Sequence, residues 1–563
     1  MTTIQETTLT VAQYAVRRLA ALGITHAFGV PGDYAFPFND ALESCEGLRW
    51  VGCANELNAA YAADGYARVK GASILCTTYG VGELSALNGV MGSKAENVPV
   101  FHLAGQASTR LQRAHRITHH TLGDGVFGNF ASISQQAAYV STNLTPDNVI
   151  AEMERVIAQT LMRCQPAYIT VAQDVAMMPV AGIPLTARRL EEISRGYSDS
   201  NELRAAVFAV TERLAAARAP VAFVSHWVSR QRLQPVAAEF LAKARLGYVT
   251  TTMDKATLEE TNPLFIGMYA GSQSVPSVKA AVDDADCVIT LGGVFWSDFN
   301  TGLWTQNINE QTLIELHGDH VRIGQNSFGP VALEDMLRAL TATTPVFAGV
   351  TTEARTMPPL TGNADDPVSS ANFYPRLQRF LRERDIVISE TGSCILPMAA
   401  MPLPTGSEFF NQTLWGSIGW ATPAVLGAAL ADPTRRVILV TGDGAHQLTA
   451  NELGTMARNN IKPIIFVLNN NEYAIEEVLN QTVGHVYDEL TRWQYHLLPT
   501  ALGCTNWFTA QVQTVAELDA ALQRAASGES AAYIEIVLGA ADLPNQLPQT
   551  VIESLYQVTP PNS

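Results

Sequence analysis

A carboxylate stands where the local sequence otherwise predicts a phosphate site. In residues 437–447, VILVTGDGAHQ, a β-branched apolar run ends at a glycine turn, and a helical pattern begins near His446. Backbone N–H groups at such a strand-to-helix turn bind phosphate oxygens. Asp443, between Gly442 and Gly444, would repel that phosphate by about 4 kcal/mol per pair of unit charges at about 4 Å, for an effective dielectric constant of about 20. A divalent cation between the two groups would reverse the sign of this interaction.

The next predicted strand supplies a second ligand for such a cation. It covers residues 463–468 and ends at Asn469 and Asn470. Because strand, helix and strand form a βαβ unit, we expect the two strands to be parallel, with their carboxyl ends side by side. Asp443 and Asn470 both offer oxygen atoms, which are the ligands of Mg²⁺ or Ca²⁺ rather than of Zn²⁺. We infer that Asp443 binds the cation that binds the phosphate.

Each of these short motifs also occurs in ordinary turns. An isolated GDG is more often structural than functional, and Asn-Asn after a strand is a common turn. Their position at the ends of two successive predicted strands favours the metal site. The GxxxxGK[ST] pattern is absent from the sequence, and GxGxxG is incomplete because Gln447 takes the place of the third glycine. These absences argue against an NTPase and against a simple dinucleotide-binding domain.

Three α/β units must position these residues. Alternating strand and helix patterns predict doubly wound parallel-sheet domains in residues 1–182, 200–345 and 370–563. The first and third units share a similar strand–helix rhythm. Segments at 179–189 and 351–370 break the pattern and are predicted linkers. The clearest predicted strands are residues 25–30, 73–79, 98–105, 167–172, 220–225, 247–252, 286–293, 385–392, 436–442, 462–468 and 531–539.

Charge and composition exclude several classes of protein. The net charge is −17 without a basic cluster, so we expect no nucleic-acid partner and no anionic membrane surface. The best candidate for a membrane span, residues 414–431, is interrupted by Gly and Pro, and we predict no span. The first ten residues lack the layout of a signal peptide. Seven scattered cysteines without a CxxC motif favour free thiols in a reducing, cytoplasmic location.

The combination of motifs resembles a known enzyme family. GDG followed about two dozen residues later by NN resembles the diphosphate–metal motif of thiamine diphosphate enzymes. Residues 52–68, GCANELNAAYAADGYAR, resemble the segment that carries their cofactor-activating glutamate. VPGDY at 30–34, HHTLGDG at 119–125 and LWGSIGW at 414–420 resemble the 2-keto acid decarboxylase branch. That branch contains the pyruvate, indolepyruvate, phenylpyruvate and branched-chain keto acid decarboxylases.

The resemblance implies non-oxidative decarboxylation of a 2-keto acid to an aldehyde and CO₂, through an ylid and an enamine of the cofactor. Glu56 would activate the cofactor through the aminopyrimidine N1′ atom. In isolation, a glutamate in an alanine-rich helix is more often a solvated residue, and a His-His pair more often a surface feature; the flanking motifs favour function. The catalytic residues implied for this chain are Glu56, Asp33, His119, His120 and Glu476.

The resemblance also implies ligands for thiamine diphosphate and Mg²⁺. Ile418 corresponds to the bulky residue beneath the folded cofactor, and the Gly416 carbonyl to the acceptor of its 4′-amino group. The implied cofactor-binding residues are Thr391, Ser393, Gly416, Ser417, Ile418, Gly442, Gly444, Ala445, Asn470, Tyr473, Ala474 and Ile475. The implied metal ligands are Asp443, Asn470 and the carbonyl of Glu472, and the implied substrate pocket contains Thr78, Ile395, Ile475 and Leu479. Ile418, Ile395 and Leu479 are also compatible with plain core packing.

The second strand is followed by a departure from the family pattern. The chain reads NNNEYAIEE at 469–477, so Glu472 replaces a glycine, Ala474 a threonine and Glu477 a commonly basic residue. We expect Glu472 to lose the conformational freedom of glycine and to add negative charge near the diphosphate. Ile395 predicts a pocket of medium size for an aliphatic or aromatic 2-keto acid, with pyruvate left open.

The resemblance also bears on the assembly, and two other functions are compatible with the sequence. The family arrangement implies a homodimer or homotetramer whose active site lies between subunits. One alternative is a carboligase or synthase of the acetohydroxyacid synthase type, which bound flavin would favour. Another is a thiamine diphosphate-binding protein without turnover, with Glu472 as the cause of the defect.

Overall fold

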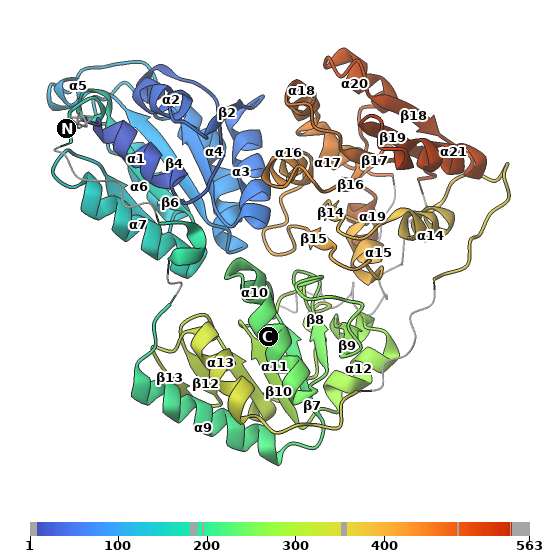
Figure 1. The fold of residues 1–563 in the computed structure, drawn as a ribbon. Helices are drawn as coiled ribbons and strands as arrows, with labels where there is room; N and C mark the ends of the chain where they lie inside the picture. Colours follow the sequence, from blue (N-terminus) through green and yellow to red (C-terminus); the bar gives the residue numbers. More distant parts are fainter. Residues whose placement is uncertain are drawn as a thin grey trace, which may run out of the picture. The chain divides into compact units, whose positions relative to one another are not determined.

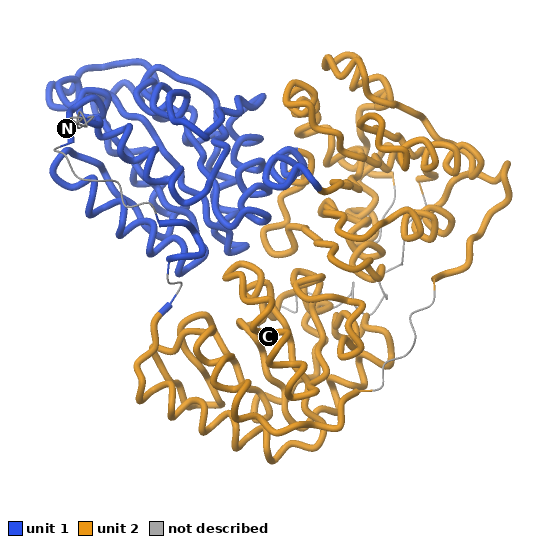
Figure 2. Tube along the Cα trace, viewed as in Figure 1, with its two compact units in different colours: residues 1–196, 423–434 blue, residues 197–422, 435–563 orange. Residues whose placement is uncertain are grey.

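The computed structural model describes residues 8–180, 188–193, 196–350, 357–480, 484–540 and 542. Three α/β domains follow one another along the chain (Figure 1). Contacts divide the chain into two compact units: residues 1–196 with 423–434, and residues 197–422 with 435–563 (Figure 2). Residues 181–187 of the first predicted linker and 351–356 of the second lie outside the described residues, as does most of the chain after residue 540.

The first domain is built on a six-stranded, fully parallel sheet with the order β2-β1-β3-β4-β6-β5. Its strands are β1 (His26–Gly29), β2 (Arg49–Gly52), β3 (Ser73–Thr77), β4 (Val100–Gln106), β5 (Val140–Asn143) and β6 (Ala167–Ala172). Its helices are α1 (Val11–Ala20), α2 (Phe36–Glu43), α3 (Glu56–Lys70), α4 (Val81–Ala95), α5 (Thr109–Arg113), α6 (Asn129–Ala137), α7 (Val149–Arg163) and α8 (Gln173–Ala176).

Local signals set the ends of these helices. The Asn55 side chain accepts a hydrogen bond from the Asn58 N–H and caps α3, and Gly71 ends that helix with φ 100°. Small residues on α3 admit α16 (Ala421–Ala431) at close range. A Cβ atom on Gly65 would lie 2.3 Å from the Ala424 carbonyl oxygen. Glycine is therefore required at this crossing, and residues 423–434 belong to the first unit through such contacts.

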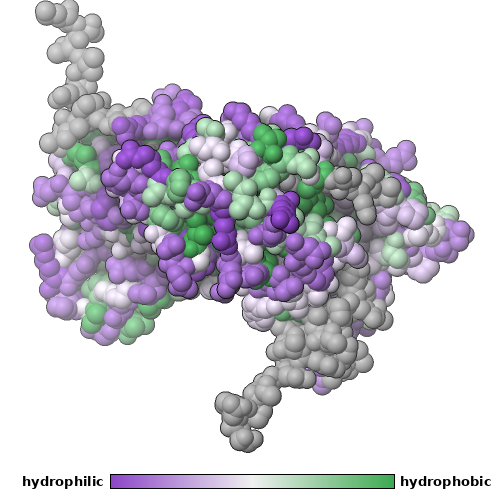
Figure 3. Space-filling view, turned by 90° about the horizontal axis from the view of Figure 1, so that it is seen from below, coloured by the Kyte–Doolittle hydropathy of each residue, from purple (hydrophilic) through white to green (hydrophobic). Residues whose placement is uncertain are grey.

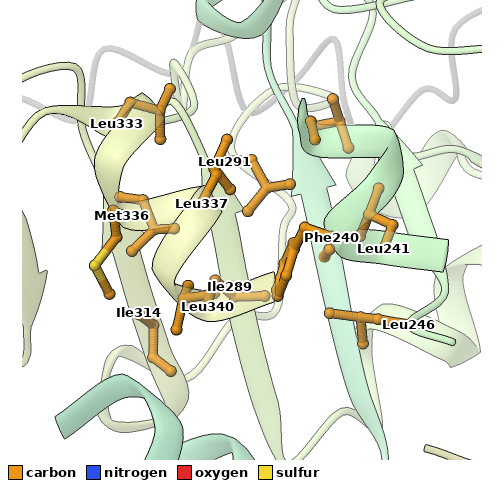
Figure 4. Close-up of a cluster of buried hydrophobic side chains, with 14 of the residues drawn as sticks. Phe240, Leu241, Leu246, Ile289, Leu291, Ile314, Leu333, Met336, Leu337 and Leu340 are labelled. Carbon is orange, nitrogen blue, oxygen red and sulfur yellow. The ribbon is translucent and has the colours of Figure 1, made fainter. Parts of the chain in front are cut away.

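The middle domain carries a seven-stranded sheet with the order β13-β12-β11-β10-β7-β8-β9. Its strands are β7 (Pro220–Val224), β8 (Tyr248–Thr250), β9 (Phe265–Met268), β10 (Cys287–Leu291), β11 (Leu313–Leu316), β12 (Val321–Ile323) and β13 (Asn326–Phe328). Its helices are α9 (Ser200–Ala216), α10 (His226–Arg230), α11 (Gln234–Ala244), α12 (Pro276–Asp283) and α13 (Leu333–Thr343). Leucine, isoleucine and phenylalanine side chains from α11, α13, β10 and β11 interdigitate in its core (Figure 4).

The third domain repeats the topology of the first. Its sheet has the order β15-β14-β16-β17-β19-β18, so the same relative strand order recurs, and every pairing within it is parallel. Its strands are β14 (Ile386–Ser389), β15 (Glu408–Phe410), β16 (Val437–Gly442), β17 (Ile464–Asn469), β18 (Phe508–Val512) and β19 (Ala532–Val537). Its helices are α14 (Ser370–Phe380), α15 (Ile395–Ala400), α17 (Asp443–Gln447), α18 (Leu453–Arg458), α19 (Ala474–Asn480), α20 (Leu498–Ala501) and α21 (Val515–Ala526).

The predicted α/β class is confirmed, with one correction. The middle sheet is mixed rather than wholly parallel, because β11, β12 and β13 pair antiparallel. The clearest predicted strands all exist, but two groups of strands were not predicted: the edge strands β2, β5, β9, β13, β15 and β18, and the interior strands β11 and β12 of the middle sheet. An edge strand pairs on one side only and is less uniformly buried, so its sequence is less apolar than that of a central strand.

The distribution of surface residues and the state of the cysteines are typical of a globular protein. Hydrophilic residues are spread across the face drawn in Figure 3, with apolar residues between them. Among the described helices, none combines the length and the apolar composition needed to cross a membrane. All seven cysteines carry free thiols.

Candidate active site

The polar ends of β16 and β17 meet as predicted. These strands are adjacent and parallel, with Gly442 opposite Leu468. Asp443 and Asn470 each follow the last residue of a strand, so both lie at the same sheet edge. The helix after β16 begins at Asp443 rather than near His446, which corrects the predicted start. An acidic residue at the first helical position is favourable because unpaired N–H groups and the helix dipole stabilise its charge.

Three predicted metal ligands converge around one another. One atom of the Asn470 side-chain amide lies 3.0 Å from the Glu472 carbonyl oxygen and 3.2 Å from Asp443 Oδ1. With nitrogen at this position, the amide donates a hydrogen bond to both oxygens. With oxygen there, three oxygens face one another and need a cation between them. Adjacent ligands of an octahedral Mg²⁺ ion, at about 2.1 Å from the metal, are about 3 Å apart. The residues present therefore fit the cation.

Asp443 is shielded from solvent, which disfavours its charged form. Its relative exposure is 2%, and burial raises the pKa of its carboxyl to about 6. The N–H groups of Gly444 and Asn471 donate to its two oxygens at 2.9 and 2.7 Å, which lowers the pKa in part. A bound cation would stabilise the ionised form further.

The replacement of glycine by Glu472 does not strain the backbone, which corrects one expectation. The residue with a left-handed conformation is Asn471, with φ 63°, and Glu472 is not among the described residues with positive φ. Asparagine tolerates this region better than most residues. The expectation that Glu472 adds negative charge near the diphosphate stays a prediction. Burial raises the pKa of Glu472, and the charges of Glu477 and Asp488 raise it further.

A cleft at the carboxyl ends of β14, β16 and β17 brings most of the predicted cofactor residues together. The predicted residues in its lining are Thr391, Ser393, Ile418, Gly442, Asp443, Gly444, Ala445, Asn470, Glu472, Tyr473, Ala474, Ile475 and Glu476. Residues in its lining that were not predicted are Ser370, Gly392, Cys394, Leu468, Leu538 and Asp542. Ile395 and Leu479 are buried on α15 and α19, outside this lining. A glycine turn and a helix start border a cavity of this composition, which suits a diphosphate with its cation.

Gly416 and Ser417 lie in the segment that leads into α16. A Cβ atom on Gly416, whose φ is 63°, would lie 3.9 Å from Thr391 Cγ2. The Thr391 hydroxyl donates to the Gln412 carbonyl oxygen at 3.1 Å, and the Ser417 N–H donates to Gln412 Oε1 at 2.9 Å. This segment is therefore held against a residue of the cleft.

Glu390 is a functional-site neighbour that sequence reasoning missed. It is fully buried at the end of β14 and accepts hydrogen bonds from the N–H groups of Thr391 and Ala421, at 3.0 and 3.4 Å. The Thr441 hydroxyl donates to it at 3.5 Å. Burial raises the pKa of Glu390 to about 7. One carboxyl thus ties β14, β16 and the start of α16 together. The only feature of the sequence that could have pointed to Glu390 is its position as an acidic residue directly after the apolar run 386–389.

In the first unit, Glu56 occupies the first position of α3, where the helix dipole favours a carboxylate. The start of α4 lies against it: a Cβ atom on Gly82 would be 3.2 Å from Glu56 Oε1 and 3.1 Å from Thr78 Cγ2. Thr78 is buried, and its hydroxyl has no hydrogen-bond partner among the described residues. Glycine at position 82 therefore leaves room beside two residues predicted to act on cofactor and substrate.

Asp33, His119 and His120 also come together in the first unit. His119 Nε2 lies 2.7 Å from Asp33 Oδ2, and His120 Nε2 lies 4.0 Å from Asp33 Oδ1. The Tyr34 ring stacks on the His119 imidazole at 4.9 Å, with 15° between the planes. These exposed or half-buried side chains can exchange protons with a bound molecule. Glu476, the last of the five predicted catalytic residues, is exposed on α19 of the second unit.

Three domain models of one family match the chain. The N-terminal TPP binding domain of thiamine pyrophosphate enzymes matches residues 9–128. The central domain matches residues 207–341, and the C-terminal TPP binding domain matches residues 390–536. Together with the fold and the cleft, these matches define the class: the chain belongs to the thiamine pyrophosphate, or thiamine diphosphate, enzyme family.

The chain is also similar to individual proteins of this family. An alpha-keto-acid decarboxylase of Mycobacterium leprae is 37% identical over 553 residues, covering 96% of this chain and 95% of the relative. One from Mycolicibacterium paratuberculosis is 37% identical over 555 residues, covering 97% of each. A solved structure described as a thiamin diphosphate-dependent enzyme from Mycobacterium smegmatis matches with a TM-score of 0.77 at 21% identity. It covers 95% of this chain and 100% of its own, and this likeness concerns the fold alone.

Proposed function

We propose that this protein decarboxylates a 2-keto acid to an aldehyde and CO₂, without oxidation, in the presence of thiamine diphosphate and Mg²⁺. The observation that carries the proposal is the Asp33, His119 and His120 cluster, which offers acid–base groups to a substrate in a chain with a diphosphate cleft. The similarity to two alpha-keto-acid decarboxylases supports it.

The cofactor supplies the electron sink for the carbon–carbon bond cleavage. In our proposal the chain would hold it through its diphosphate: the backbone N–H group of Ala445 would bind a phosphate oxygen beside Gly442 and Gly444, while Asp443, Asn470 and the Glu472 carbonyl would bind Mg²⁺. The Asp443 carboxylate then faces a cation rather than a phosphate, which removes the repulsion inferred from the sequence.

The remaining residues have proton-transfer roles. Glu56 would hydrogen-bond the aminopyrimidine ring of the bound cofactor and would favour the loss of a proton from it. Asp33, His120 and Glu476 hold or move protons on the substrate after CO₂ has left, and His119 is positioned by Asp33 through their 2.7 Å contact. Such groups act best when their pKa values lie near the working pH.

We propose a cleft suited to medium aliphatic or aromatic side chains. Ile475 lines the cleft beside Glu476. We propose that Ile395, Leu479 and Thr78, which are not in its lining, also contribute to substrate selection. Replacing Ile475 with alanine should raise the relative rate with indolepyruvate over pyruvate. The same rate ratio before and after the substitution would contradict this role.

The decisive experiment is an aldehyde assay over pyruvate, branched-chain 2-keto acids, phenylpyruvate, indolepyruvate and benzoylformate. Asp443→Ala serves as the matched control, because it should lose the cofactor. We expect aldehyde from at least one substrate with the wild type and none above background with the control. Bound flavin with carbon–carbon ligation as the main activity would favour a synthase instead. Bound cofactor without any aldehyde would favour a binding protein.

We further propose a cytoplasmic homodimer or homotetramer, in which Glu56 of one subunit serves a cofactor held by Asp443 of another. The inactive variants Glu56→Gln and Asp443→Ala test this when they are unfolded, mixed and refolded. A shared site in a two-fold dimer regenerates one intact site in each hybrid, so about a quarter of wild-type activity should return. No recovery, or a fully active monomer in sedimentation, would refute the shared site.

A further inference from the structure

The Asp33, His119 and His120 side chains have the composition of a metal site that is distinct from the oxygen site at Asp443. One ligand atom from each residue lies within 4.8 Å of the others. The side chains are 40%, 57% and 30% exposed respectively, so an ion from solvent can reach them. They combine two imidazoles with one carboxylate.

This donor set selects a class of ion. Imidazole nitrogen suits Zn²⁺, Ni²⁺, Co²⁺ and Cu²⁺, whereas Mg²⁺ prefers an all-oxygen environment. Two histidines and one carboxylate on one side of a metal leave its other positions open to water or a substrate oxygen. Ligand atoms about 2.0–2.2 Å from such an ion are about 3–3.5 Å apart. The 2.7 and 4.0 Å separations observed here bracket that range, so small side-chain rotations suffice.

The backbone that carries these ligands is held by its own contacts. The Tyr34 hydroxyl donates to the His119 carbonyl oxygen at 3.3 Å, and Gln173 Nε2 donates to the Asp33 carbonyl oxygen at 2.5 Å. His120 has φ 62°, and a Cβ atom on Gly80 would lie only 2.6 Å from its carbonyl oxygen. A site whose ligands are already assembled loses less conformational entropy when the ion binds.

We propose that Asp33, His119 and His120 bind one transition-metal dication, such as Zn²⁺ or Ni²⁺, and that the bound ion inhibits the enzyme. The ion replaces the hydrogen bond between His119 and Asp33 with metal–ligand bonds and occupies the nitrogen lone pairs that proton transfer requires. The inhibition rests on the proposed function; the binding site does not.

Calorimetry with Zn²⁺ and absorption spectroscopy with Co²⁺ test the site on protein already loaded with thiamine diphosphate and excess Mg²⁺. We expect one strong ion per chain that Mg²⁺ does not displace. His119→Ala, His120→Ala and Asp33→Asn should each weaken binding by more than about tenfold, since even losing a hydrogen-bond partner of a ligand typically costs about 10- to 100-fold. Three separate variants keep the test decisive if one of them fails to fold.

A second histidine pair provides the matched control. The His317 and His320 rings stack at 4.3 Å in the middle domain, near Glu315 and Asp319. Replacing both histidines with glutamine should leave the strong Zn²⁺ site unchanged. Loss of the site in this control, or strong binding that persists in all three variants at residues 33, 119 and 120, would overturn the proposal.

Turnover measured in parallel tests the inhibition separately from the metal site. If the wild type forms aldehyde, stoichiometric Zn²⁺ should abolish it and EDTA followed by excess Mg²⁺ should restore it. Aldehyde formation that continues with the site filled would refute the inhibition. If no 2-keto acid yields aldehyde, the proposed function fails, and the calorimetry still decides whether the site exists.

Discussion

Replacing Glu390 with glutamine should remove a pH dependence that this buried carboxyl imposes on stability. Glu390 is fully buried, and its pKa rises from 4.5 to about 7 because burial disfavours the charged form. The unfolded chain therefore releases this proton at a lower pH than the folded protein does. The stability that Glu390 contributes is fully present below about pH 4.5 and is lost as the pH rises through about 7.

The size of the effect follows from the two pKa values. At about 1.4 kcal/mol per pKa unit, the difference between 4.5 and about 7 corresponds to roughly 3 kcal/mol in the free energy of unfolding. About 2.5 kcal/mol of it falls between pH values of about 5 and about 8. Glutamine adds a constant cost, because its NH₂ group faces the N–H groups that now donate to Glu390. The pH dependence, and not the absolute stability, is therefore the quantity to compare.

Chemical denaturation of the cofactor-free protein at the two pH values measures this difference. The stability of the wild type relative to Glu390→Gln should fall by about 2.5 kcal/mol from the lower to the higher pH. Glu383→Gln, an exposed glutamate near the start of the same strand, is the control and should behave as wild type. Difference infrared spectra should contain a protonated carboxyl band in the wild type below neutral pH that Glu390→Gln lacks. Equal pH responses in the wild type and Glu390→Gln would refute the reasoning.

Other predictions concern the cofactor. Asp443→Ala should abolish retention of thiamine diphosphate in equilibrium dialysis at ordinary concentrations, because the cation loses its buried carboxylate; wild-type binding that is unchanged in EDTA would contradict this. Glu56→Gln should still bind cofactor but exchange its C2 proton more slowly, with about 1.4 kcal/mol of barrier for each tenfold loss. Glu476→Gln should exchange that proton at a nearly normal rate and slow later steps, and the opposite pattern would reverse the two roles. Glu472→Gly should preserve or improve Mg²⁺ affinity in calorimetry by removing a charge without relieving strain; weaker binding would make the side chain a positive contributor.

The sequence by itself determined the features that depend on neighbouring residues. Apolar β-branched runs alternating with helical patterns predicted three α/β domains, because burial of a parallel sheet imposes that pattern. Asp443 and Asn470 could be predicted to meet because β16, a short helical segment and β17 form one βαβ unit, whose crossover brings successive strands side by side.

Only the tertiary structure decided the features that depend on distant or fully buried contacts. The 2.7 Å approach of His119 to Asp33 joins residues 86 positions apart, and no local pattern reports such a distance. Motif similarity proposed both residues, but not their contact. The antiparallel edge of the middle sheet depends on pairing between β11, β12 and β13, which are only three or four residues long and too short for a clear sequence pattern.

At the cleft, Glu390 and Glu472 are two further residues whose surroundings could not be predicted from the sequence. Nothing in the run 386–389 reveals that the next carboxyl accepts hydrogen bonds from Thr391 and Ala421. The sequence placed the lost glycine at position 472, yet the left-handed backbone lies at Asn471. Backbone dihedral angles and buried hydrogen bonds are set by packing around a site, and that packing includes segments remote in sequence.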